Sequence, residues 1–86
     1  MKAKTKRKEL PLFHVILINE QQPTDKLIQA LVHISMLEVG KAKEIADLST
    51  KAGEAIILTT HKERAELIQQ QFHYLSPPIQ TKLLEA

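Results

Sequence analysis

The chain contains no cysteine, no tryptophan and only two glycines among its 86 residues. The lack of cysteine excludes disulfides and thiolate zinc sites. Because Gly40 and Gly53 are the only glycines, the sequence contains neither a glycine-rich phosphate-binding loop nor a dinucleotide-binding fingerprint. One tyrosine and two phenylalanines are also too few aromatic rings for a surface on which nucleic-acid bases stack.

The usual catalytic groupings are missing as well. None of the four histidines lies three or four residues from another, so no helix carries a histidine pair for a metal. No serine has the flanking glycines of a nucleophile elbow. Carboxylate pairs such as Glu63 and Glu66 fall on a helix face that we expect to be exposed, where nearby Lys or Arg explains them. We therefore expect a protein that is not an enzyme and that uses no metal or other cofactor.

The basic residues are concentrated at the N-terminus. Five of the twelve Lys and Arg residues fall within the first eight positions, so the remaining seven are outnumbered by ten acidic residues. We predict a flexible basic tail over residues 1–10 and one folded domain over residues 11–86. A solvated terminus is our interpretation of the tail, and contact with RNA or with an acidic protein surface is the alternative.

No segment has the pattern of a membrane span or a secretion signal. The longest apolar run, residues 13–18, is interrupted by His14 and is far too short to cross a bilayer. The basic start of the chain leads into a short strand-like run rather than the apolar core of a signal peptide. We expect a cytoplasmic protein without a membrane partner.

Apolar periodicity predicts three strands and three helices in the order β-α-α-β-α-β. The expected strands are 12–18, 54–59 and 79–83, and the expected helices are 25–36, 40–51 and 61–74. One core should contain a large apolar side chain from each element before the last strand: Ile16, Leu31, Ile45, Ile57, Ile68 and Phe72.

Three local signals mark the expected helix ends. Thr24 follows Pro23 and can cap the first helix, and Gly53 stands where a C-terminal cap prefers glycine. Thr60 and Glu63 have the spacing of a capping box, which predicts the start of the third helix.

The stretch Val15-Ile16-Leu17-Ile18-Asn19-Glu20, followed by Pro23, resembles the first strand and loop of the ClpS family. These adaptors carry proteins with N-terminal degradation signals to the ClpA or ClpC unfoldase. The likeness continues through Lys41-Ala42, is strongest over residues 53–60, and ends at Pro78-Ile79 and the C-terminal Leu84-Glu85-Ala86. It implies an α/β chain of the α+β type, with a three-stranded antiparallel sheet packed against three helices.

The resemblance implies a site for the free α-amine of a substrate. An ammonium group needs oxygen acceptors around it, because a desolvated, unpaired charge is costly. Asn19 matches an Asn of the family, and Glu20 stands in place of its Asp. Thr50 stands where the family has a His at the end of the second helix. These three residues are the expected amine-binding set.

A side-chain pocket and a docking residue follow from the same resemblance. Positions that are usually larger and apolar in the family are smaller or polar in this chain, whereas two others keep the apolar pattern. The expected pocket residues are Thr24, Leu27, Ala46, Ser49 and Ile79. Glu63 matches an acidic position with which the family docks on its unfoldase.

The sequence thus predicts a divergent ClpS-like adaptor. It would bind a Clp-type AAA+ unfoldase, ClpA or ClpC, and select or modulate protein substrates, with N-degron recognition as the implied mode. The alternative is a ribosome- or RNA-associated module, because the C-terminal domain of the ribosomal stalk protein shares the fold. That protein lacks the loop at Asn19 and Glu20, so we rank it second and do not expect a nucleic-acid partner.

Overall fold

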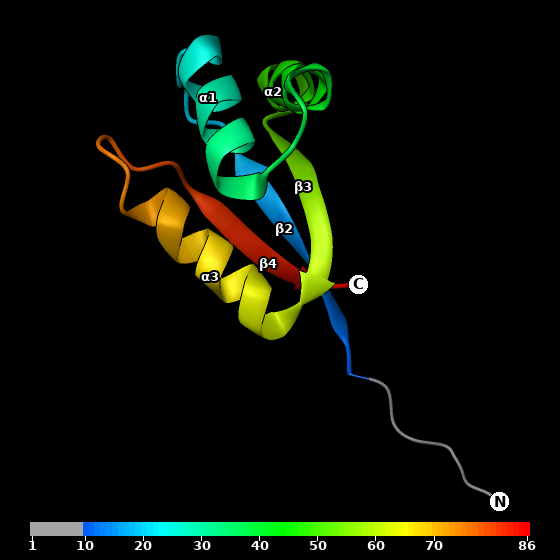
Figure 1. The fold of residues 1–86 in the computed structure, drawn as a ribbon. Coiled ribbons are helices and arrows are strands. Elements are labelled where there is room, and N and C mark those ends of the chain that lie inside the picture. The colour runs from blue at the N-terminus through cyan, green and yellow to red at the C-terminus, as the bar shows by residue number, and fades with distance from the viewer. Residues whose placement is uncertain (1–9) are drawn as a thin grey trace, which may run out of the picture.

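The order of helices and strands is the one predicted from periodicity. The computed structural model describes residues 10–86, so all but the last residue of the predicted basic tail lies outside the described residues. The elements, shown in Figure 1, are strands β2 (Leu12–Ile18), β3 (Glu54–His61) and β4 (Thr81–Glu85) and helices α1 (Thr24–Ser35), α2 (Val39–Ala52) and α3 (Lys62–His73).

The three strands form one antiparallel sheet, as the resemblance implied, and β2 lies in its centre. Large and β-branched apolar residues fill β2, and such residues suit a strand with a neighbour on each side. Leu17 lies opposite Ala55 on β3 and Thr81 on β4, and a bulge on the β3 side shifts the register between Val15 and Ile16. Figure 1 shows β4 beside β2, although the two strands come from opposite ends of the domain.

The helices bury one face of this sheet. Val15 and Leu17 have no exposed surface and belong to one cluster with apolar side chains of all three helices. Of the predicted core residues, the cluster contains the following: Leu31, Ile45, Ile57, Ile68 and Phe72. Ile16 is buried but is not part of that cluster, because alternate side chains of a strand point to opposite faces. Its prediction as a residue of the same core is therefore wrong.

One of the three predicted caps is present. Gly53 ends α2 with a φ of 87°, and its N–H donates to the carbonyl of Ser49 over 2.8 Å. Thr24 is the first residue of α1 rather than its cap, because the carbonyl of Pro23 already accepts the first helical hydrogen bond, from Leu27 at 3.2 Å. That cap prediction was wrong.

The capping box at Thr60 was also wrong. Strand β3 continues to His61, so Thr60 pairs with Phe13 in the sheet, and α3 has no side-chain cap bond. Glu63 lies in the first turn of α3, where a carboxylate is favoured by the positive end of the helix dipole.

The last strand begins two residues later than predicted. The N–H of Ile79 donates to the carbonyl of Phe72 over 3.1 Å, so this residue is fastened to the end of α3 instead of the sheet. Sheet pairing starts with Thr81. No helix among the described residues is long and apolar enough to cross a bilayer.

Candidate functional site

Asn19 is the centre of a hydrogen-bond network at the end of β2. Its Oδ1 accepts the backbone N–H groups of Gln21 at 2.9 Å and Gln22 at 3.2 Å. Its Nδ2 donates to Ser49 Oγ and Thr50 Oγ1, each at 3.2 Å. Because both carbonyl lone pairs and both amide hydrogens are in use, this one side chain fastens the loop to the end of α2.

The two hydroxyls that accept from Asn19 are themselves fixed. Ser49 Oγ donates to the carbonyl of Ala46 at 2.8 Å, and Thr50 Oγ1 donates to the same carbonyl at 3.0 Å. The backbone N–H of Asn19 donates to the carbonyl of Gly53 at 2.9 Å. The loop after β2 and the last turn of α2 therefore form one connected unit.

A recess of about 230 Å³ lies over this unit. Its walls come from the loop after β2, the first residue of α1 and the end of α2. Four of the residues predicted for binding line it together: Asn19, Thr24, Ser49 and Thr50. Gln21, Gln22 and Gly53 complete the lining, so hydroxyl, amide and backbone groups surround the recess, and among the described residues no charged side chain does.

The chain matches no family model and no curated protein. Among solved structures, it is similar to the ClpS2 protein of Agrobacterium tumefaciens bound to L-phenylalaninamide. The TM-score is 0.85 at 14% sequence identity, and the match covers 91% of this chain and 100% of the other. The chain has the ClpS fold. This likeness confirms the fold that the resemblance implied.

Not every residue predicted from the ClpS pattern lines the recess. Glu20 is exposed in the same loop but is not part of the lining. Leu27 and Ala46 have no exposed surface, and Ile79 is 4% exposed, because all three are packed in the core. Of the predicted side-chain pocket, only Thr24 and Ser49 line the recess, and Ser49 is itself fully buried beneath it.

Glu63 lies apart from the recess. It is exposed in the first turn of α3, and Figure 1 shows that this end of α3 lies at the opposite end of β3 from α2. A partner that binds at Glu63 would thus leave the recess open to solvent at that contact.

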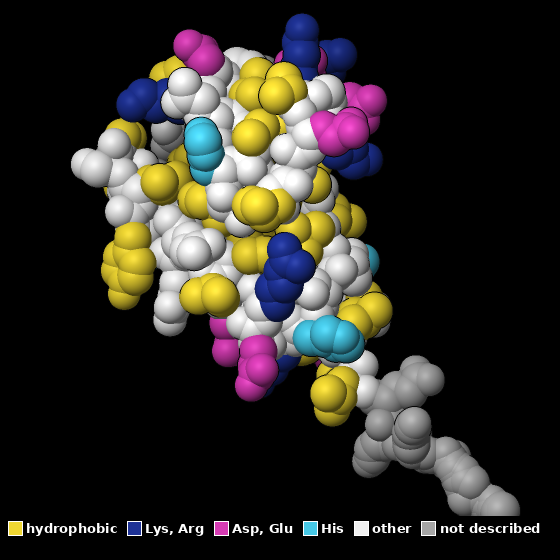
Figure 2. All heavy atoms as spheres, in the orientation of Figure 1, with side chains coloured by type: hydrophobic (Ala, Val, Ile, Leu, Met, Phe, Trp, Pro, Cys, Tyr) yellow, Lys and Arg dark blue, Asp and Glu magenta, His cyan; other side chains and the backbone are white. Residues whose placement is uncertain are grey.

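This ClpS-like chain also has a groove that sequence patterns did not indicate. It has a volume of about 220 Å³ and lies between α1 and the turn that follows α3. On the face seen in Figure 2, apolar side chains reach the surface in a band between α1 and α3. Gln22 lines both the groove and the recess, and its Nε2 donates to the carbonyl of Pro78 at 3.4 Å. In the sequence, only the Pro77-Pro78 pair predicts the turn that forms one wall of this groove.

Proposed function

We propose that this chain is a ClpS-like adaptor that binds a Clp-type unfoldase and selects protein substrates by their free N-terminal amine. The recess at the junction of β2, α1 and α2, in a chain with the ClpS fold, carries the proposal. The similar ClpS2 protein is bound to L-phenylalaninamide. That compound has a free α-amine and an amidated carboxyl group, as the first residue of a peptide has. The proposed role is binding, without a covalent step.

Glu20 is the proposed counter-charge for the amine. An ammonium group entering the recess needs acceptors, and Asn19 Oδ1 already accepts two backbone N–H groups. The role that this geometry supports for Asn19 is to hold the loop. Glu20 follows it directly, is exposed, and carries a carboxylate in the same loop as the lining residues Asn19, Gln21 and Gln22. The exposed hydroxyl of Thr50 is the second acceptor.

The lining of the recess favours a small or hydroxyl-bearing first side chain. A large apolar side chain gains from burial only where it meets apolar surface. Leu27 and Ala46 offer none, so the apolar surface of the recess belongs to carbon atoms of polar residues and of Gly53, and Thr24 and Thr50 present hydroxyl groups beside it. Within the proposed function, serine or threonine at the substrate N-terminus therefore fits better than phenylalanine.

The test is a titration of ¹⁵N-labelled protein with serinamide and L-phenylalaninamide, each compared with its N-acetyl form. We expect the free amines alone to shift the N–H signals of Gln21, Gln22 and Gly53, and serinamide to bind more tightly. Glu20→Gln should abolish the difference between free and acetylated amines. Glu66→Gln, an exposed charge on α3, is the matched control and should change nothing. Equal shifts from the acetylated compounds would refute recognition of the amine.

The unfoldase contact is proposed for Glu63. Its exposed carboxylate at the start of α3 is available to a basic partner surface. Calorimetric titration with ClpA or with ClpC measures this contact. Glu63→Lys should weaken binding, whereas Asp47→Lys, an exposed charge on α2, should not. No heat of binding with either partner would refute the adaptor role.

A further inference from the structure

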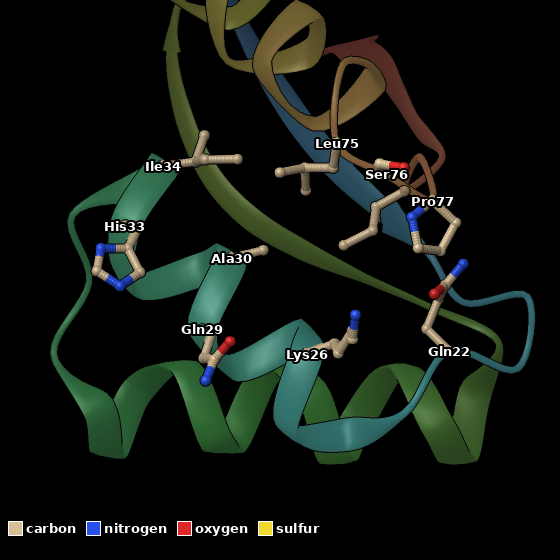
Figure 3. A pocket seen from close by; sticks show the side chains of 10 residues that line it. Gln22, Lys26, Gln29, Ala30, His33, Ile34, Leu75, Ser76 and Pro77 are labelled. Carbon is tan, nitrogen blue, oxygen red and sulfur yellow. The ribbon is translucent and has the colours of Figure 1, made fainter.

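The groove between α1 and the turn after α3 has apolar side chains on both sides. Ala30 and Ile34 of α1 line one side, and Leu75 and Pro77 of the turn line the other. Figure 3 shows the side chains of Ile34 and Leu75 pointing toward each other across the upper end of the groove. Ile79, which is 4% exposed, also lines the groove. An apolar group that enters would therefore exchange water for hydrocarbon on two sides.

The size of the groove limits what can enter it. Its volume is about 220 Å³, below the range of about 300–1,000 Å³ that is common for pockets of drug-sized ligands. A single aliphatic side chain fits this space, and a bulky cofactor does not. The occupant is thus expected to be one side chain of a larger molecule that continues outside the groove.

The rim of the groove matches a peptide backbone. Gln22 and Gln29 carry side-chain amides, and Ser76 carries a hydroxyl, so each can both donate and accept a hydrogen bond. A peptide unit presents one donor and one acceptor per residue. Figure 3 places Gln22 and Ser76 on the side of the turn and Gln29 on α1. A peptide lying across the groove thus meets polar partners on both sides.

The charge at the groove has one sign. Figure 3 shows the Lys26 side chain directed from α1 toward the space between helix and turn. Within residues 10–86, no Asp or Glu lines the groove, and the ion pairs are Lys41 with Glu44 and Lys82 with Glu54. Lys26 therefore has no carboxylate partner among the described residues. A carboxylate on the incoming peptide would supply one.

From these observations we propose that the groove is a second binding site, which takes an aliphatic side chain of a peptide segment with a carboxylate beside it. The site does not use a free amine, so it does not depend on the proposed function of the recess. Because Gln22 lines both spaces, an extended substrate held by its amine could also reach the groove within its first few residues.

The test uses acetylated peptides, which have no free amine. ¹⁵N-labelled protein is titrated with N-acetyl-Glu-Leu-Glu-amide, and with two comparison peptides in which Leu is replaced by Ser or both Glu by Lys. We expect the first peptide to shift the N–H signals of Ala30, Ile34 and Leu75 and the side-chain amide of Gln22. The Ser and Lys peptides should bind at least fivefold more weakly.

Two variants and a control locate the site. Lys26→Glu should weaken binding of the acidic peptide by roughly fivefold, the scale of one exposed charge pair. Ala30→Met should fill the groove and abolish the shifts while it keeps a strong helix former at that position. Lys43→Glu, an exposed lysine on α2, should leave binding unchanged.

Equal binding of the acidic and basic peptides, or shifts outside the groove, would overturn the proposal. Such a result would leave the serinamide titration of the recess intact. Conversely, failure of the amine titration would not alter binding of the acetylated peptides, so the two proposals fail separately.

Discussion

Replacement of Asn19 tests whether one side chain holds the loop against α2. Asn19→Ala removes the acceptor of two backbone N–H groups and the donor to Ser49 and Thr50. Asn19→Asp keeps the oxygen that accepts the N–H groups of Gln21 and Gln22 but has no N–H to donate. Comparison of the two variants therefore separates the two halves of the network.

The size of the effect follows from burial. The bonds to Thr50 and from Gln21 are exposed, so water replaces them at little cost. The bonds to Ser49 and from Gln22 are partly buried. Each contributes about 0.5–1.5 kcal/mol, so Asn19→Ala should lower the free energy of unfolding by about 1–3 kcal/mol. Asn19→Asp retains one of these two bonds and should lose about half as much.

Urea denaturation followed by circular dichroism measures these differences, because the midpoint shifts in proportion to stability. Thr59→Ala is the control: it removes an exposed bond of 2.7 Å between Thr59 Oγ1 and His14 Nδ1, and its cost should be within about 0.5 kcal/mol. An Asn19→Ala variant no less stable than Thr59→Ala would refute the anchoring role. Equal losses for Asn19→Ala and Asn19→Asp would refute the importance of the acceptor.

Four further substitutions have definite expected outcomes. Phe72→Ala empties the position of a large, fully buried side chain and should cost about 3–5 kcal/mol in urea denaturation. Gly53→Ala places a side chain at a φ of 87° and should cost about 1–2 kcal/mol, whereas at Gly40, in the first turn of α2, an added Cβ would meet no side chain or more distant backbone within 4 Å, so Gly40→Ala should raise the melting temperature; two shifts of the same sign would contradict this. Thr50→His replaces the short hydroxyl acceptor with an imidazole nitrogen on a longer side chain; a hydrogen bond to a charged group is worth roughly 1.5–3 kcal/mol, and the longer acceptor should tighten binding of L-phenylalaninamide about tenfold; an equal gain for the N-acetyl form would contradict the amine site.

Periodicity predicted the helices and strands closely because it reports which side chains face the core. All six elements exist, and their ends agree with the predictions to within about two residues. Two of the predictions that were wrong concern residues whose structure is decided by hydrogen bonds to residues that lie elsewhere in the chain. Thr60 has the spacing of a cap, but its pairing with Phe13 keeps it in β3. Ile79 has the alternation of a strand, but its bond to Phe72 keeps it at the end of α3.

The candidate site was predictable only in part for the same reason. The resemblance indicated Asn19, Ser49 and Thr50, and the structure brings them within hydrogen-bond distance. The burial of Leu27 and Ala46 depends on how α1 and α2 pack together, which no local spacing reveals. The groove was missed because its two walls come from α1 and from the distant turn after α3.

The central position of β2 has a consequence for how the domain folds. Neither of its pairings is a hairpin: even the nearest paired residues, Ile18 and Glu54, are separated along the chain by both α1 and α2. β4 joins β2 only across the rest of the domain. Forming such long-range contacts costs the entropy of loop closure before the contacts stabilise the chain, and this slows folding. We therefore expect the local contacts between α1 and α2 to form before the sheet pairs, which the folding and unfolding rates of variants in these two helices would test.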